Sequence, residues 1–290
     1  NGTDLNNNKY AGVTIGAGQA LNFKDITLKN FTNTYLVENN GVTNITSAIL
    51  NNVTIINNTK NTGYGNKGLN LTSVILDNSN ITNTGGIEFY GENELKKGSI
   101  DSTATDALVD IREGTTTVGN DFVINSKIFN FGGSGSNLKV ATINNYGTIN
   151  SQYANLNYTN INNYGTLMLE SVQDLVGSST NIVNNGEMFS SFLSLANNSK
   201  FTNNNKFTGV VKCGGEIINN GTIDGEHIEW YENGNVKLKE YCKYGLVLKM
   251  QEFDEEGNVI KEKIELNESE KAIYEKRVEY YEKQKNREEC

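Results

Sequence analysis

Carboxylates gather between residues 92 and 113, where the surrounding sequence carries few charges. The candidates for chemistry are Asp101, Asp106, Asp110 and Glu113. Two carboxyl groups about 5–9 Å apart can hydrolyse a glycosidic bond, and clustered carboxylates can bind calcium. The alternative is a solvated loop that bulges from the fold. We favour the loop, because lysine and arginine are sparse along residues 1–225 and the basic group that a polysaccharide lyase needs is hard to find there.

Tyrosines form the second candidate group, namely Tyr146, Tyr153, Tyr158 and Tyr164. Aromatic faces offer apolar area with a polar tip, which suits the binding of sugars. Tyr146 and Tyr164 occupy equivalent places in a repeated phrase, so they can instead stack on each other outside the core. Both interpretations stay open from the sequence.

Histidine and cysteine offer little chemistry, because the chain has one histidine, His227, and three cysteines. The cysteines, Cys213, Cys242 and Cys290, lack the spacing of a metal site. We therefore expect no metal and no cofactor. A disulfide between Cys213 and Cys242 is one possibility in an exported protein, and two buried free thiols are the other.

The chain is organised around a seven-residue phrase that is repeated five times. Its copies are 143–149, 161–167, 182–188, 201–207 and 217–223. Each copy has an apolar residue at both ends, and its third place is always asparagine: Asn145, Asn163, Asn184, Asn203 and Asn219. A short repeat that cannot bury its apolar residues alone must stack on its neighbours, as in a solenoid.

The repeated asparagine predicts a ladder in which each side-chain amide bonds to the next coil, so that no buried amide is left unpaired. The alternative is that asparagine simply marks surface turns. The fifth place is glycine in four copies and Asn205 in one. Because these two residue types tolerate a left-handed backbone, we expect that conformation there.

Short alternating strands with similar phrases extend back to the N-terminus, with longer and irregular coils. Residues 1–225 are therefore predicted to form a right-handed parallel β-helix. The net charge of −9 argues against a nucleic-acid partner. No apolar run approaches the ~20 residues of a membrane span. Because the chain opens on Asn1 without a signal peptide, we expect a mature product or an excised fragment.

Composition changes abruptly near residue 225, and 29 of the 65 residues from 226 onward are charged. Residues 226–266 contain two related units, Trp230-Tyr-Glu-Asn-Gly-Asn-Val-Lys237 and Phe253-Asp-Glu-Glu-Gly-Asn-Val-Ile260, which predict β-hairpins. Residues 267–290 are predicted to be an amphipathic helix. Asn267 and Glu270 form its capping box. Its apolar stripe is Ile273, Tyr274, Val278 and Tyr281. The helix can cap the rod or associate with a second chain.

Two resemblances follow from these motifs. The Asn/Gly/Thr-rich phrases over residues 10–225 resemble the passenger domains of bacterial autotransporter adhesins. That resemblance implies an exported rod, although no membrane barrel follows the rod in this chain. The two hairpin units resemble MORN-variant repeats, which occur in bacterial surface proteins and antitoxin-like proteins.

Three functions remain open. The first, which we favour, is an extracellular or surface-displayed adhesin-like rod without catalysis, whose partner is a host or bacterial surface protein or glycan. The second is a carbohydrate-binding or polysaccharide-degrading β-helix. The third is a partner-binding protein associated with toxins or immunity, with self-association through the C-terminal helix as a further possibility.

Overall fold

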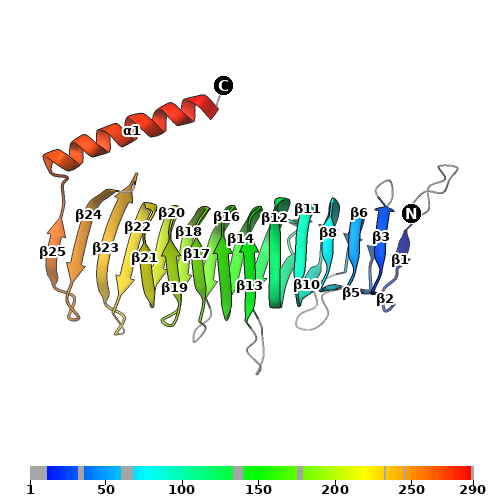
Figure 1. The fold of residues 1–290 in the computed structure, drawn as a ribbon. Coiled ribbons are helices and arrows are strands. Elements are labelled where there is room, and N and C mark those ends of the chain that lie inside the picture. The colour runs from blue at the N-terminus through cyan, green and yellow to red at the C-terminus, as the bar shows by residue number, and fades with distance from the viewer. Residues whose placement is uncertain are drawn as a thin grey trace.

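The structure is a computed structural model that describes residues 12–31, 36–59, 68–132, 140–174, 179–231, 233–244 and 246–288. The side chains of Phe31, Ile223 and residues 280–288 lie outside this description. The described chain forms an elongated rod of parallel strands that ends in antiparallel strands and a single helix (Figure 1). The parallel β-solenoid predicted from the repeats is confirmed.

Each coil contributes to three stacked faces, which we call A, B and C. Face A contains β1 (Val13–Ile15), β4 (Val37–Asn39) and β9 (Ser79–Asn83). Face B contains β3 (Thr27–Phe31), β8 (Ile75–Asp77), β13 (Ala141–Asn145), β15 (Thr159–Asn163), β17 (Asn181–Asn184), β19 (Lys200–Asn203) and β21 (Glu216–Asn219). Face C begins with β2 (Ala20–Lys24), β5 (Val42–Thr46), β7 (Gly68–Thr72) and β10 (Gly86–Tyr90).

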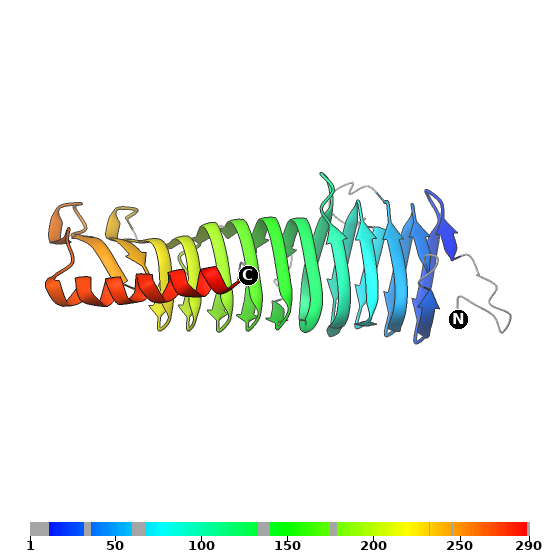
Figure 2. The same ribbon diagram turned by 90° about the horizontal axis from the view of Figure 1, so that it is seen from above.

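Longer strands bend from one face to the next. β6 (Ile49–Asn57) and β11 (Asn93–Ser102) run from face B into face A. β14 (Thr148–Leu156), β16 (Thr166–Asp174), β18 (Glu187–Leu195), β20 (Lys206–Cys213) and β22 (Thr222–Trp230) run from face A into face C. β12 (Leu108–Phe131) is the longest strand and pairs in turn with strands of faces C, B and A. Figure 2 shows these bends from above.

The core is a narrow column of apolar side chains enclosed by the three faces. The apolar ends of the repeated phrase supply it, and Ile143, Ile149, Ile161 and Leu167 are fully buried. Alternation along each strand directs every second side chain inward, so these residues stack on the same positions of neighbouring coils. Burial of each such side chain stabilises the fold by about 1.5–3 kcal/mol.

The glycines at the fifth place of the phrase do not have the left-handed backbone that the sequence suggested. Gly147, Gly165, Gly186 and Gly221 are absent from the residues with positive φ, and so is Asn205. The coils approach too closely for a side chain instead: a Cβ on Gly165 would lie 2.2 Å from the carbonyl oxygen of Gly147. At these four turns the spacing between coils leaves no room for a Cβ, although the fourth copy carries Asn205 at the same place.

The chain leaves the solenoid through an antiparallel extension of face C. β22 pairs with β23 (Val236–Lys243), which is followed by β24 (Leu246–Phe253) and β25 (Val259–Lys263). The predicted hairpins are thus present, and their turns are alike. Gly234 N donates to Tyr231 O and Gly257 N to Asp254 O, both at 3.0 Å. The composition boundary at residue 225 falls inside β22, which the rod and these strands share.

Helix α1 (Glu268–Glu288) begins at the predicted capping box. Glu270 N donates to Asn267 Oδ1 at 2.9 Å, and Asn267 N donates to Glu270 Oε2 at 3.0 Å. The predicted stripe is only partly used, because Ile273 is 42% exposed. Tyr274 lies against Tyr244, with the two ring centroids 5.9 Å apart. The helix turns back over the rod (Figure 2).

Candidate functional site

A buried ionic cluster lies on the outer side of face C, where β10 stacks on the start of β12. Ile87 and Phe89 of β10 point into the core, so Glu88 between them points outward. Glu88 pairs in register with Asp110 of the next coil, which places two carboxylates side by side. Their side chains are 6% and 1% exposed. Such a pair is costly to bury without a counterion.

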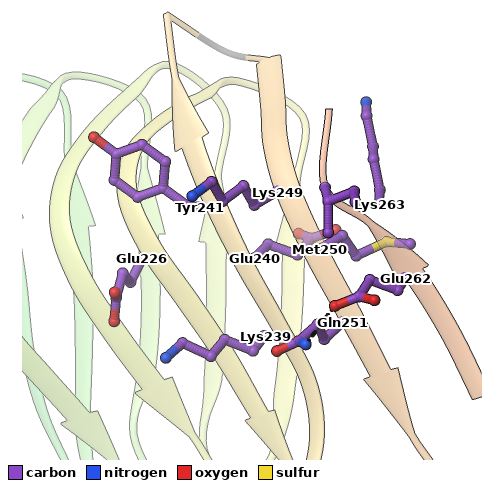
Figure 3. A pocket seen from close by; sticks show the side chains of 10 residues that line it. Glu226, Lys239, Glu240, Tyr241, Lys249, Met250, Gln251, Glu262 and Lys263 are labelled. Carbon is purple, nitrogen blue, oxygen red and sulfur yellow. Dashed lines mark hydrogen bonds between the residues drawn. The ribbon is translucent and has the colours of Figure 1, made fainter. Parts of the chain in front are cut away.

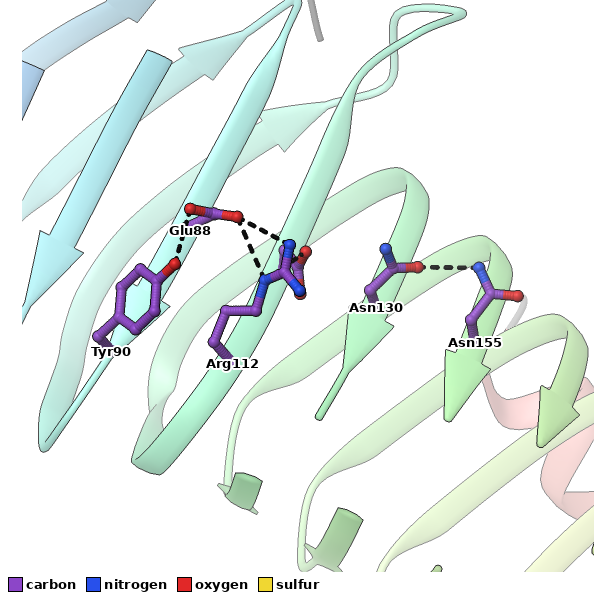
Figure 4. A network of polar contacts seen from close by, with 6 residues as sticks. Glu88, Tyr90, Arg112, Asn130 and Asn155 are labelled. Atoms are coloured by element: carbon purple, nitrogen blue, oxygen red, sulfur yellow. Dashed lines mark hydrogen bonds and ion pairs between the residues drawn. The ribbon is translucent and has the colours of Figure 1, made fainter. Parts of the chain in front are cut away.

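Arg112 supplies the counterion (Figure 4). Its Nη2 lies 2.9 Å from Glu88 Oε1, and its Nε lies 2.9 Å from Asp110 Oδ2. The Tyr90 hydroxyl donates to Glu88 Oε2 at 2.8 Å. We call these four residues the Arg112 cluster. Each carboxylate is therefore held by a charge-assisted bond, and Glu88 accepts from two side chains.

The protonation of the Arg112 cluster follows from these contacts. Burial disfavours the charged guanidinium, but Asp110 and Glu88 outweigh that effect and raise the pKa of Arg112. Burial and the hydrogen bond to Glu88 also raise the pKa of Tyr90. Arg112 stays cationic and Tyr90 stays neutral at ordinary pH. Because the guanidinium of Arg112 binds both carboxylates, the Arg112 cluster can hold two neighbouring coils together.

Of the four acidic residues singled out in the sequence, only Asp110 belongs to this cluster. Asp101 is exposed in β11 and accepts a bond from Thr103 at 2.8 Å. Asp106 is exposed in the connection between β11 and β12, and Glu113 is half-buried in β12. Glu88, Tyr90 and Arg112 were missed by the sequence argument. Arg112 is the only arginine before residue 226, which is a signal that could have directed attention to it.

The four candidate tyrosines lie at different places around the coil. Tyr146 and Tyr164 follow the face B strands and stack with centroids 4.8 Å apart and planes 7° apart, as one of the two interpretations predicted. Tyr153 lies within β14 and is 48% exposed, with Lys127 Nζ 5.6 Å from its ring centre. Tyr158 is half-buried in the turn between β14 and β15. The four side chains therefore do not form one stacking platform.

The five repeated asparagines form a continuous chain of hydrogen bonds inside face B. Each Nδ2 donates to the Oδ1 of the next: Asn145 to Asn163 at 2.8 Å, Asn163 to Asn184 at 2.7 Å, Asn184 to Asn203 at 2.8 Å and Asn203 to Asn219 at 2.9 Å. The same amides also donate to backbone carbonyls of the next coil. A second ladder, Asn39 to Asn57 to Asn83, lies in face A of the earlier coils.

Polar ladders also run along the outer surface of the rod. Asn130 and Asn155 are joined at 2.8 Å (Figure 4), and Asn144 and Asn162 at 2.9 Å. These pairs follow the same register as the strands that carry them. Much of the asparagine in the rod is thus committed to bonds between coils.

His227 marks the junction between the rod and the antiparallel strands. It takes an inward place directly over Val211 and is 7% exposed. Its Nδ1 lies 3.0 Å from Glu240 Oε2, and its Nε2 lies at an ion-pair distance of 3.4 Å from Glu229 Oε1. Burial opposes protonation, but the two carboxylates raise the pKa of His227 to about 9. The histidine is therefore a buried cation that ties β22 to β23.

The two described cysteines are free thiols, which settles the alternative left open by the sequence. Cys213 pairs in register with Glu229, whereas Cys242 pairs with Gly225. Those two partners are four residues apart on β22, a span of about 13 Å, so a disulfide is out of reach. Burial raises the pKa of Cys213 to about 11 and that of Cys242 to about 12.

An open hollow of about 460 Å³ lies on the antiparallel strands (Figure 3). Tyr241, Lys239 and Lys249 line it together with Glu226 and Glu262. Register places these side chains on the outer side of the sheet, opposite to the inward row that contains His227. The hollow therefore combines an aromatic ring with both signs of charge, a lining that suits a polar ligand or a peptide.

Neither a metal site nor a membrane helix emerges from the described part of the chain. Within it, no group of three or more His, Cys, Asp or Glu side chains is arranged to hold a metal ion. The described helix is too polar to cross a bilayer. Comparison with protein-family models, with curated proteins and with solved structures found no match in any of the three. The autotransporter and MORN-variant resemblances thus rest on the sequence motifs alone.

Proposed function

We propose that this chain is an extracellular or surface-displayed rod that makes adhesin-like contacts with host or neighbouring cells and performs no catalysis. The observation that supports the proposal is that polar side chains of the rod bond from one coil to the next. The asparagine ladders and the Arg112 cluster bond coil to coil, so these groups serve the length and stiffness of the rod. Stacked coils of this kind give an extended surface, the usual basis of binding in solenoids.

The hollow around Tyr241 is the part of the molecule that we assign to partner contact. Lys239 and Lys249 line it, and both are exposed. The strands that carry it, β23 to β25, lie at the end of the rod, beyond the last parallel coil (Figure 1). The partner is a surface protein or glycan that presents both hydroxyl or carboxylate groups and a flat apolar face.

The test measures binding and turnover together. The purified chain is applied to a glycan array and to a panel of cell-surface proteins, and the same glycans are assayed for shortening. We expect binding without turnover, with affinity at least ~10-fold weaker for Tyr241→Ala, a loss of about 1.4 kcal/mol. Tyr153→Ala is the matched control, because Tyr153 is similarly exposed on the rod.

Two outcomes would overturn parts of the proposal. Release of shorter sugars that disappears in Asp110→Asn would show an enzyme and refute the non-catalytic rod. Equal loss of binding in Tyr153→Ala and Tyr241→Ala would move the contact surface from the hollow to the rod.

A further inference from the structure

Two rows of outward side chains cross the antiparallel strands in the hollow around Tyr241. In register, the first row is Glu226, Tyr241 and Lys249, and the second row is Lys239, Gln251 and Glu262. All six side chains line the hollow (Figure 3). Neighbours within a row stand opposite each other on adjacent strands, with Cβ atoms about 4.5–5.5 Å apart. The hollow therefore presents one ordered set of side chains to a ligand.

Two of the three lysines that line the hollow have no ionic partner within the described part of the chain. Lys263 is paired with Glu270 at 2.8 Å. Lys239 and Lys249 are exposed, and neither has a described carboxylate at ion-pair distance. They are diagonal neighbours on adjacent strands, about 7–8 Å apart, which long side chains can span. One carboxylate of a ligand can therefore contact both ammonium groups.

Two of the three carboxylates that line the hollow are engaged by neighbouring side chains. Glu240 Oε2 lies 3.0 Å from Nδ1 of the buried cation His227. Glu262 accepts a hydrogen bond from Gln251 Nε2 at 2.6 Å. Glu262 also lies on β25, two strands away from Lys239 on β23, or about 10 Å across the sheet. The two free lysines are therefore not neutralised by these carboxylates.

Tyr241 stands between charges of opposite sign in the first row. Lys249 lies opposite it on β24, and Glu226 lies opposite it on β22. The tyrosine is 41% exposed, which leaves apolar area of its ring for a ligand. A ligand that lies on this ring places a carboxylate toward Lys249 and a hydroxyl toward Glu226. The reverse orientation is disfavoured, because Glu226 repels a carboxylate.

The lining of the hollow favours a sugar over a peptide. A sugar ring combines an apolar face with several hydroxyl groups that need hydrogen-bond partners, and seven of the ten lining side chains are charged or amide groups. The two rows lie on the face of the sheet, so a peptide cannot add a strand there by main-chain pairing. The volume of about 460 Å³ falls within the range of about 300–1,000 Å³ for small-ligand sites.

We propose that the hollow recognises a carboxylated sugar, whose ring stacks on Tyr241 and whose carboxylate is bound by Lys249 and Lys239. Glu226 accepts a hydroxyl group of the same sugar and sets its orientation. This inference rests on the contact role proposed for the hollow and adds the chemical class of the ligand. It predicts a preference for an acidic sugar over a neutral sugar of the same shape.

Matched acidic and neutral sugars test the proposal. The probes are a short oligogalacturonate and sialyllactose, each compared with its methyl ester, which keeps the ring and removes the charge. Isothermal titration calorimetry measures their binding to the full chain. We expect at least one acid to bind ~10-fold more tightly than its ester, since two exposed ion pairs contribute up to about 2 kcal/mol. The preference should vanish at about 1 M salt, where the Debye length is about 3 Å.

Substitutions assign the preference to the lysines of the hollow. Lys249→Gln should weaken binding of the acid ~5-fold, the upper range for loss of one exposed ion pair. Lys249→Arg keeps the charge and should retain the preference. Lys261→Gln is the matched control, because Lys261 is exposed on the same sheet but does not line the hollow. Circular dichroism checks that each variant is folded.

Several results would overturn the proposal while leaving the adhesin-like function in place. Equal affinity for each acid and its ester is one, provided that Tyr241→Ala still weakens binding. Equal losses in Lys249→Gln and Lys261→Gln are another, because binding would then follow net charge alone. Absence of binding to all four sugars, with a surface protein bound at the hollow, would favour a peptide ligand. Release of shorter sugars would instead refute the non-catalytic function and leave the preference for the acid intact.

Discussion

The rod and its antiparallel extension carry one continuous inward row of side chains, yet the two regions fill it differently. In the rod the row is Ala154, Val172, Leu193 and Val211. Beyond the rod it continues as His227, Glu240, Met250 and Lys263. The change follows the end of the opposing layer, because β21 is the last described strand of face B. Beyond the last coil, three of the four side chains in the row are ionisable, and Met250 is the exception.

A buried charge of the rod should be tolerated only when its ionic partner is present. Removal of Arg112, the counterion of Glu88 and Asp110, tests this most severely. Arg112→Met should lower the free energy of unfolding by about 3–5 kcal/mol, because Glu88 and Asp110 are left buried side by side. Urea unfolding of the full chain measures it. The triple variant Arg112→Met, Glu88→Gln, Asp110→Asn should recover more than half of the loss. A loss below about 1 kcal/mol would show that the cluster is better solvated than its burial implies.

The inner asparagine ladder should matter far more than the outer one. Asn163→Ala removes the acceptor of Asn145 and the donor to Asn184, both in fully buried surroundings. We expect a loss of about 3 kcal/mol in unfolding free energy. The adjacent Asn162→Ala removes one half-exposed bond to Asn144 and should cost less than about 1 kcal/mol. Equal losses would contradict a special role for the inner ladder.

The junction should respond to pH in a range where the rod does not. The folded state raises the pKa of His227 to about 9 from its ordinary 6.5, so the protonated form stabilises the fold. That stabilisation is complete below pH 6.5 and is lost as the pH rises to about 9. It amounts to at most about 3 kcal/mol.

The fluorescence of Trp230, the single tryptophan, reports unfolding of the junction, because Trp230 ends β22. His227→Phe is the control and should abolish the dependence between pH 6.5 and 9. A pH dependence that persists in the control would assign it to other groups.

The smallest effect is expected on the outer surface of the rod. Tyr164→Ala removes the stacking partner of Tyr146 and should cost about 1 kcal/mol. Tyr153→Ala serves for comparison, since Tyr153 has the same exposure but only a distant contact with Lys127. Thermal unfolding of the two variants would resolve the difference. A greater loss in Tyr153→Ala would show that the stack contributes little.

Local sequence patterns were enough to predict the repeating unit. Apolar residues at both ends of the phrase predicted the core, and the repeated Asn145, Asn163 and Asn184 suggested the ladder that the structure contains. The capping box at Asn267 and the hairpin turns could likewise be read from a few adjacent residues. Each of these features depends on contacts within one turn, or on the same residue recurring in each coil.

Contacts between unlike coils could not be predicted in the same way. The earlier coils vary in length, so the sequence does not reveal that Glu88 stands beside Asp110 and accepts from Arg112. The spacing of coils also explains Gly165, whose need for a bare Cα comes from the neighbouring Gly147 and not from its own backbone angle.

The sequence by itself determined the strand, the position of the turn and the polar ladder of each repeated coil, because these repeat locally, but it did not determine the backbone conformation of the turn. Only the tertiary structure decided which charges meet, that Cys213 and Cys242 stay apart, and that His227 enters the core row. The physical reason is that stacking brings residues about 20 positions apart into register, and irregular loops set that register coil by coil.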